Sequence, residues 1–532
     1  MDHIGTFSLV LHSHIPYCRR SGVWPFGEEW VFEAVVETYI PILDWLLNCH
    51  EKGVGPNVTL SFSPVLAEQL ADAYMKSRIV EYMDARANAA RADLMRHELV
   101  HDDRLARLSR KYVEYYENAK KRFIDYYDGD LLGAIAKLAA SGRVEVLATS
   151  ASHAYLPLLP QESRIRTQIR VGYEACQRHF GVLPKGAWLP ECGYKPGAIE
   201  RALEECGIEY FIVDTPAIAG GGPRNLYGGV PEALRRNIGA GLPSMATLMP
   251  YRLRGSKMAV FGRDEVTAAQ VWSRDVGYPG DGNYLEFHKR DDSSGLRYWR
   301  VTNKLLDFGQ KQLYDPEAAL ASARTHAQHF AGVVEERLGG YAERTGRHGI
   351  IVAPYDMELF GHWWHEGVDW LSLAMDALCA SNRVECGTLG SYLKLHPPVD
   401  ELELPECSWG HGGRHGVWFN SETEWMWQEI ERATAIGREL EGVIGGLDGV
   451  HKIMADQALR ELMLLEASDW PFLVTTGQAG GYARDRFAQH LSDFEVLAQA
   501  AMARETDLRS LEVLEASSSR DSVFTWIDWG SL

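Results

Sequence analysis

The sequence lacks the features that mark several large classes of protein. It contains no run near the roughly 18 apolar residues that a transmembrane helix needs. It has no excess of basic residues, and its formal net charge of -19 argues against nucleic acid or an anionic membrane as a partner. Its eight cysteines include no Cys-x-x-Cys pair, which indicates reduced thiols rather than a disulfide framework. The first residues lack the basic start and long apolar core of a signal peptide, so we expect a cytoplasmic protein.

The composition is typical of a globular protein and is rich in aromatic residues. The 532 residues are 46% hydrophobic and 24% charged, and no internal repeat or low-complexity tract interrupts them. This length suffices for two or three domains, or for one large barrel with additions. The 16 tryptophans and 23 tyrosines are many, and several lie next to carboxylates. The acidic and aromatic-rich composition therefore favours a protein that acts on a neutral ligand.

Two short apolar runs are each followed by a carboxylate with aromatic residues nearby in the sequence. Residues 187–189 lead to Glu191, with Trp188 and Tyr194 on either side, and residues 350–355 lead to Asp356, which the aromatic segment 360–364 follows. Barrel enzymes keep their catalytic groups at strand ends, and a pair of carboxylates is the minimum needed to cleave a glycosidic bond. Either residue alone would more often be a solvated loop carboxylate. Together, among rings that can stack on sugars, they predict a catalytic pair.

Three histidines follow predicted strands and allow three interpretations. His12 and His14 are separated by one residue, which places both imidazoles on one side of the chain, and His153 follows another strand. They are metal ligands, hydrogen-bonding groups for sugar hydroxyls, or structural histidines. A metal site needs a third and a fourth ligand, and no Asp/His cluster with suitable spacing follows His14.

Four tryptophans lie in Gly/Pro-rich or polar surroundings rather than on apolar helix faces. They are Trp24, Trp272, Trp409 and Trp418. Trp409, for example, is followed by three glycines within four residues and has little local core to join. We therefore expect these rings to act as platforms for a ligand.

Strand and helix patterns alternate over most of the chain. The expected strands are 6–12, 57–62, 144–149, 185–189, 210–214, 258–261 and 349–353. The expected helices are 28–51, 162–180, 196–206, 422–439, 450–466 and 483–501. The alternation predicts an α/β protein with a parallel sheet, and about seven strands with active residues at their ends favour a barrel. Residues 65–140 read as a helical insertion in a catalytic domain of residues 1–405, and residues 406–532 read as a C-terminal helical domain.

The motifs as a set resemble glycoside hydrolase family 57, and among its members the 1,4-α-glucan branching enzymes. The resemblance covers nearly the whole chain and is carried by the motifs 12–17, 24–29, 188–191, 270–273, 277–280, 353–356, 408–410 and 465–472. It implies an incomplete (β/α)7 barrel with a helical insertion and a C-terminal helical domain. It also implies a retaining mechanism without a metal or other cofactor.

The resemblance further implies roles for individual residues. Glu191 would be the nucleophile and Asp356 the general acid/base, and His12, His14 and His153 would line the donor site. The remaining residues expected to bind or enclose substrate are Trp24, Tyr227, Arg263, Trp272, Gly280, Trp409, Trp418, Asp469 and Gln478. Branching members carry a tyrosine in a flexible loop over the cleft, and Tyr227 in the glycine-rich segment 219–249 is its equivalent here.

Four functions therefore compete. The first is a branching enzyme that acts on α-glucans and makes α-1,6 branches, as in glycogen biosynthesis. The second is an α-amylase or 4-α-glucanotransferase on the same scaffold. The third is a metal-dependent deacetylase built on His12 and His14, and the fourth is a glucan-binding protein without activity. The sequence carries no indication of oligomeric state.

Overall fold

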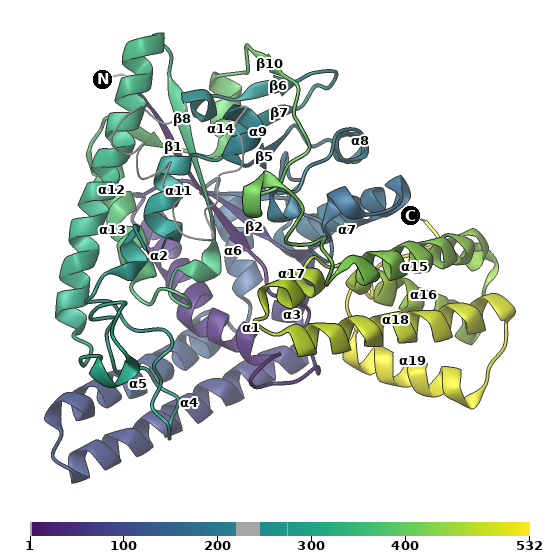
Figure 1. The fold of residues 1–532 in the computed structure, drawn as a ribbon, viewed down its shortest axis with the longest axis horizontal. Coiled ribbons are helices and arrows are strands. Elements are labelled where there is room, and N and C mark those ends of the chain that lie inside the picture. The colour runs from purple at the N-terminus through teal and green to yellow at the C-terminus, as the bar shows by residue number, and fades with distance from the viewer. Residues whose placement is uncertain (1–2, 220–244, 274, 532) are drawn as a thin grey trace.

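The strands of the molecule are short, parallel in most pairs and buried. The computed structural model describes residues 3–219, 245–273 and 275–531 (Figure 1). Its strands are β1 (Gly5–Ser13), β2 (Val58–Phe62), β3 (Val144–Leu147), β4 (Gly186–Ala187), β5 (Tyr210–Val213), β6 (Tyr251–Leu253), β7 (Ala259–Gly262), β8 (Gly349–Asp356), β9 (Val384–Cys386) and β10 (Glu401–Leu402). The seven strands predicted from apolar runs are confirmed as β1 to β5, β7 and β8. The sequence does not predict β6, β9 or β10, because strands of two or three residues carry no readable period.

The strands form two sheets that two isolated bridges connect. One sheet has the order β3-β2-β1-β8, with β9 also paired to β1, and the other has the order β10-β6-β7-β5-β4. All pairs are parallel except β6 with β7. Single parallel bridges join Ala148 to Ala187 and Arg263 to Val352, and so connect β3 with β4 and β7 with β8. The α/β class is therefore confirmed.

Helices pack around the strands and form the C-terminal part of the chain (Figure 1). In the N-terminal half they are α1 (Glu29–Ala34), α2 (Ile40–Glu51), α3 (Pro64–Ala71), α4 (Ala73–Leu99), α5 (Asp103–Lys121), α6 (Leu131–Ala140), α7 (Glu162–Phe180), α8 (Ala198–Glu205) and α9 (Thr215–Ala219). In the C-terminal half they are α11 (Glu265–Trp272), α12 (Pro316–Thr345), α13 (Gly367–Ala380), α14 (Leu389–Leu395), α15 (Glu424–Val443), α16 (Gly449–Leu465), α17 (Asp469–Thr476), α18 (Gly480–Ala503) and α19 (Leu508–Arg520). In the described part of the chain, none of these helices is long and apolar enough to cross a bilayer.

The helix predicted at residues 28–51 is interrupted. A π-helical turn, η1 (Val35–Tyr39), separates α1 from α2, and all five of its residues are buried. Periodicity alone does not reveal such a turn, since one extra residue hardly changes the apolar pattern. The other predicted helices are confirmed as α7, α8, α15, α16 and α18.

The longest helix, α12, is missing from the prediction. In its first half the buried face is a row of alanines at four-residue steps, namely Ala319, Ala323, Ala327 and Ala331, and in its second half the buried face includes Arg337. Small alanines and a buried arginine weaken the contrast between the two faces, so the amphipathic signal is weak.

Residues 65–140 are almost entirely helical in the structure. α4 and α5 form a long pair that extends away from the strands at the lower left of Figure 1. Each helix begins at an aspartate whose carboxylate caps the first turn: Asp72 accepts from the Met75 N–H at 2.9 Å, and Asp102 accepts from the Leu105 N–H at 3.0 Å.

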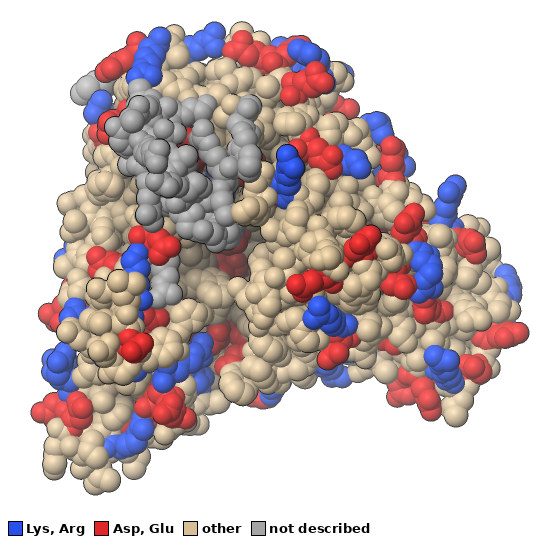
Figure 2. Space-filling model, viewed as in Figure 1, with Lys and Arg blue, Asp and Glu red and all other residues tan. Residues whose placement is uncertain are grey.

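The parallel strands bring distant residues to one edge of the molecule. His12 near the end of β1 is the register partner of Asp356 at the end of β8. The last helices, α15 to α19, form a bundle beside this edge (Figure 1). Figure 2 shows a hollow between the strand-containing part and this bundle, with acidic side chains inside it.

Candidate active site

The first carboxylate, Glu191, lies in a strained turn. β4 ends at Ala187, and Glu191 lies in the short 3-10 turn η4 (Pro190–Cys192) that follows. Glu191 has φ +62° and Cys192 has φ +49°, so two consecutive non-glycine residues occupy the left-handed region. Such residues cost about 1–3 kcal/mol each and persist only where the surroundings hold them.

Two hydrogen bonds hold the carboxylate of Glu191. Trp409 Nε1 donates to Oε2 at 2.6 Å, and Ser468 Oγ donates to Oε1 at 3.3 Å. Burial, together with the charge of Asp469, raises the pKa of Glu191 to about 7, although the two donors and the nearby His14 act to lower it. The carboxyl is thus poised to change its protonation state close to neutral pH.

The second carboxylate, Asp356, is the last residue of β8. Burial raises its pKa well above the usual value for aspartate, and the charges of Glu358 and Glu191 raise it further, while Arg263 lowers it. The negative charge on Glu191 therefore favours the protonated form of Asp356. Two carboxyls with different tendencies to ionise can act as a base or nucleophile and an acid.

The three histidines predicted from the strand ends are brought together. The His14 and His153 rings stack with centroids 3.7 Å apart, and His12 Nε2 lies 3.0 Å from His153 Nε2. The Nδ1 atoms of His12 and His14 form hydrogen bonds with Ser61 and Ser63 at 3.2 and 2.8 Å. Burial and the neighbouring imidazoles lower the pKa of His12 and His153 well below the usual value, so both are neutral near pH 7.

Residues of the C-terminal helices reach this histidine group. Asp469, the first residue of α17, accepts from His14 Nε2 at 2.9 Å. Ser468 contacts both His153 Nδ1 at 2.8 Å and Glu191, and its backbone N–H donates to the His153 carbonyl at 3.1 Å. Ser468 is not among the residues predicted to form the site, although it directly precedes Asp469, which is.

Two tryptophan rings pack against Trp409, which holds the carboxylate of Glu191. Trp409 packs edge-on against Trp188 and Trp272, with centroids 5.1 and 6.0 Å apart, and the guanidinium of Arg263 lies 5.6 Å from its ring centroid. Trp188 also stacks on His12 at 4.9 Å. Trp409 is only 6% exposed. Its packing partners come from segments far away in the sequence, which is why the local sequence offers none.

The chain is similar to known proteins over most of its length. The family model "Glycosyl hydrolase family 57" matches residues 8–405, which is most of the chain. The chain belongs to glycosyl hydrolase family 57. A second model, "1,4-alpha-glucan branching enzyme, C-terminal", matches residues 437–531.

Several members of family 57 are similar to this chain over nearly its whole length. The 1,4-alpha-glucan branching enzyme of Thermococcus kodakarensis is 42% identical over 98% of this chain and 77% of its own. The crystal structure of that enzyme superposes with a TM-score of 0.91 and covers 99% of this chain and 96% of that one, at 41% identity. A probable 1,4-alpha-glucan branching enzyme of Mycobacterium tuberculosis is 32% identical over 98% of this chain and 97% of its own. The alpha-amylase AmyC of Thermotoga maritima has a TM-score of 0.85 at 28% identity and covers 99% of this chain and 98% of that one.

Other predicted substrate residues of this family 57 protein lie farther from the two carboxylates. Trp418 is 1% exposed and stacks on Tyr155 at 4.3 Å, one layer behind the Trp409 segment. Trp24 is 74% exposed. Gly280 ends the 3-10 turn η6 (Tyr278–Gly280), and Gln478 is exposed just after α17. Within residues 3–219, 245–273 and 275–531, none of these four donates a hydrogen bond to Glu191 or Asp356.

The last two predicted substrate residues are Arg263 and Tyr227. Arg263 is buried, and its Nε donates to Asp214 at 2.8 Å. Tyr227 lies outside the described residues.

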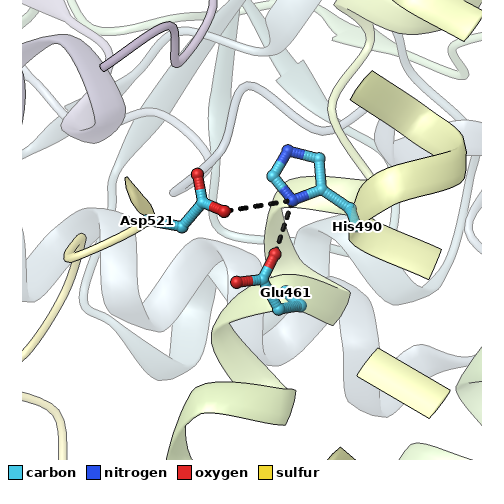
Figure 3. Close-up of side chains that lie close together, drawn as sticks. All are labelled: Glu461, His490 and Asp521. Atoms are coloured by element: carbon cyan, nitrogen blue, oxygen red, sulfur yellow. Dashed lines mark hydrogen bonds and ion pairs between the residues drawn. The ribbon is translucent and has the colours of Figure 1, made fainter. Parts of the chain in front are cut away.

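One group with the spacing of metal ligands lies away from the active site. Among the described residues, Glu461, His490 and Asp521 in the C-terminal bundle place one ligand atom each within 4.8 Å of one another (Figure 3). His490 Nδ1 contacts Glu461 at 2.6 Å, and Arg486 donates to His490 Nε2 at 2.9 Å and to Asp521 at 3.0 Å. Both ring nitrogens are therefore engaged within the protein, and the group reads as a buried ion network that ties α16, α18 and the C-terminal segment together.

Proposed function

We propose that this protein is a 1,4-α-glucan branching enzyme. One observation carries the proposal: Ser468, which holds the carboxylate of Glu191, belongs to the C-terminal segment that the branching-enzyme model matches. The substrate is an α-glucan of the amylose or glycogen type, a neutral ligand that suits a chain with a net charge of -19.

Glu191 acts as the nucleophile and Asp356 as the general acid/base. Asp356 gives its proton to the glycosidic 4-oxygen as the bond from this oxygen to the anomeric carbon breaks. The Glu191 carboxylate forms a new bond to the same carbon. The electrostatics support these roles, since burial and the charges of Glu358 and Glu191 raise the pKa of Asp356 and so favour its protonated form. A retaining enzyme needs the two carboxyl groups about 5–5.5 Å apart.

The second half of the reaction transfers the chain. The Asp356 carboxylate takes the proton from the 6-hydroxyl of another glucan, and the oxygen of that hydroxyl attacks the anomeric carbon and releases Glu191. Transfer requires that water be kept from the intermediate. The packed rings of Trp188, Trp272 and Trp409 cover one side of the Glu191 carboxylate.

The histidines and most of the remaining predicted residues line the substrate site. The ring nitrogens of His12, His14 and His153 form hydrogen bonds with one another and with Ser61, Ser63, Ser468 and Asp469. A hydroxyl of the sugar nearest the scissile bond therefore binds here by replacing one of these partners. Trp24, Tyr227, Gly280 and Gln478 serve subsites farther along the glucan. Trp418 is fully buried, so it supports the Tyr155 ring and does not contact sugar. We further propose that the seven principal strands form an incomplete (β/α)7 barrel, closed by the bridges at Ala148 and Arg263.

The domain boundaries and the cellular location are also part of the proposal. Residues 1–405 form the catalytic domain with the helical insertion at about 65–140, and residues 406–532 form the C-terminal domain that completes the cleft. All eight cysteines are unpaired, which supports a cytoplasmic location.

The alternative is hydrolysis or 4-α-glucan transfer on the same scaffold, which the likeness to an alpha-amylase favours. Incubation with amylose separates these functions. A branching enzyme lowers the iodine absorbance without releasing matching reducing ends, and debranching of the product then releases short chains. A hydrolase releases one reducing end for each bond cleaved. A 4-α-glucanotransferase changes chain length without making chains that debranching releases.

The same assay tests the deacetylase alternative. Chelator treatment should leave the activity unchanged. Elemental analysis should find no stoichiometric metal. A metal ion held tightly by His12 and His14 would overturn the proposed role of these histidines.

A further inference from the structure

The turn that follows Asp356 is bound to a single π-helical turn. In η1, Thr38 Oγ1 donates to the Phe360 carbonyl at 2.8 Å and accepts from the His362 N–H at 3.2 Å. Gly361 between them has φ +99°, and a Cβ atom there would lie 1.8 Å from the Glu37 carbonyl oxygen. The two segments therefore approach so closely that only glycine fits at position 361.

The residues on either side of Thr38 add side-chain contacts. Glu37 accepts from Arg297 at 2.6 Å and pairs with His362 Nδ1 at 3.2 Å. The Tyr39 hydroxyl donates to Oε1 of Glu358, two residues after Asp356. Three consecutive residues of η1 thus fix the segment 358–362, and π-helical turns are frequent at functional sites.

We propose that Glu358, held by η1 through Tyr39, is a positioning residue whose negative charge keeps the transferable proton on Asp356. The inference rests on the proposed function, because it assigns Asp356 the role of the acid. It adds a third carboxyl to the catalytic pair, one that does not touch substrate.

The hydrogen-bond donors support this division of charge. Glu358 accepts from Tyr39, and Glu191 accepts from Trp409 and Ser468. In the described ranges of the chain, no side chain donates a hydrogen bond to Asp356. A donor stabilises the ionised form of a carboxyl, so these hydrogen bonds favour ionised Glu358 and Glu191, while Asp356 has no such donor to favour its ionised form.

The charged groups around the two carboxyls come from several elements. Burial raises the pKa of Glu358 to about 7, while the Tyr39 hydrogen bond and the nearby His14 and His362 lower it. Asp356 faces Glu358 in its own turn, Glu191 from η4 and Arg263 from the end of β7. Of these three groups, Arg263 opposes the protonation of Asp356.

The test is Glu358→Gln, which removes the charge and keeps the size of the side chain. We expect the alkaline limb of the pH profile of kcat/KM on amylose to move down by about one pH unit, with KM unchanged. The rate at a pH above that limb should fall about tenfold, and the rate on its acid side should stay close to that of the wild type. A merely structural role would lower the rate equally at every pH.

A second readout follows Asp356 directly and needs no activity. In enzyme labelled with 13C at the aspartate side-chain carboxyl carbons, the signal that Asp356→Asn removes should titrate at lower pH in Glu358→Gln than in the wild type. An unchanged titration overturns the inference. Because this measurement works on an inactive protein, it separates a failure of this inference from a failure of the proposed function.

Two further variants guard against misfolding. Tyr39→Phe removes only the donor and should shift the same signal in the same direction by a smaller amount. Glu366→Gln is the matched control, because burial also raises the pKa of Glu366 to about 7, but its carboxyl accepts from the Leu285 N–H at 3.0 Å and does not act on Asp356. If Glu366→Gln shifted the Asp356 titration as much as Glu358→Gln does, Glu358 would have no specific role.

Discussion

Trp409 is bound to Glu191 at two points. Its indole Nε1 donates to Oε2 at 2.6 Å, and its backbone N–H donates to the Glu191 carbonyl at 2.9 Å. The backbone bond secures a residue that lies in the left-handed region, and the indole bond orients the carboxylate. One tryptophan therefore supports both the strained turn and the direction of the attacking oxygen.

Replacing Trp409 with Phe should separate these two effects. The ring would still pack between Trp188 and Trp272, but the donor to Glu191 would be lost. A hydrogen bond to a charged group contributes about 1.5–3 kcal/mol, so we expect kcat to fall roughly 10- to 100-fold. The acid limb of the pH profile should move to higher pH, while the melting temperature changes little.

Trp370→Phe is the control for the loss of an indole nitrogen. Trp370 is buried in α13, away from the carboxylates. It should change stability without moving the acid limb. If Trp409→Phe kept the wild-type limb, the indole bond would have no effect on the charge of Glu191.

Glu191 should destabilise the folded protein at alkaline pH. Its pKa is about 7 in the fold, against 4.5 for an ordinary glutamate, so the folded state binds more protons between these values. Stability therefore falls as the pH rises from about 4.5 to 7, and the cost is fully present above pH 7. Glu191→Gln should be inactive yet more stable than the wild type, by at most about 3 kcal/mol at pH 8 and by much less at pH 5. Urea unfolding at the two pH values measures this, and an equal gain at both would contradict it.

Asp356→Asn should lose activity on glucans by several orders of magnitude, because no group then protonates the leaving oxygen. A donor with a good leaving group needs no such proton, so the variant should still form a glycosyl-enzyme from it. Mass spectrometry of the intact protein detects this adduct. Equal loss on both donors would point to a binding role for Asp356.

Ser468→Ala should lower kcat about tenfold, since it removes one donor to Glu191 and the partner of His153 Nδ1. The matched control is Ser8→Ala in β1. Ser8 is equally buried, and its hydroxyl has no hydrogen-bond partner within the described residues. Steady-state kinetics on amylose for both variants should show a loss for Ser468→Ala alone.

Tyr227→Ala should change the outcome of the reaction rather than its first step. We expect a ring at this position to shield the glycosyl-enzyme from water, so its loss should lower branching and raise the share of hydrolysis. Tyr227→Phe should be milder. The ratio of branch points to reducing ends is the measurement, and an unchanged ratio would favour the hydrolase alternative.

The strands and the positions of the two carboxylates at strand ends could be predicted because their signals are local. A buried parallel strand is a continuous apolar run, and Glu191 and Asp356 follow such runs directly. His12, His14 and His153 could be found in the same way. The structure adds that their rings stack on one another.

The supporting residues could not be predicted because their contacts are not local. Tyr39 and Glu358 are 319 residues apart. Nothing in the local sequence around Glu358 indicates this contact. The π-helical turn that presents Tyr39 leaves no mark in the hydrophobic pattern. Ser468 is an ordinary serine until the fold places it between His153 and Glu191.

The bond between Ser468 and Glu191 also has a consequence for the order of events during synthesis. The two residues are 277 positions apart, so Glu191 leaves the ribosome well before its partner is made. At about 5–20 residues per second, this interval lasts roughly 14–55 seconds. Throughout that time the nascent chain carries the proposed nucleophile without one of its two carboxylate donors. A growing chain should therefore act on α-glucan at least about tenfold more slowly until translation is nearly complete.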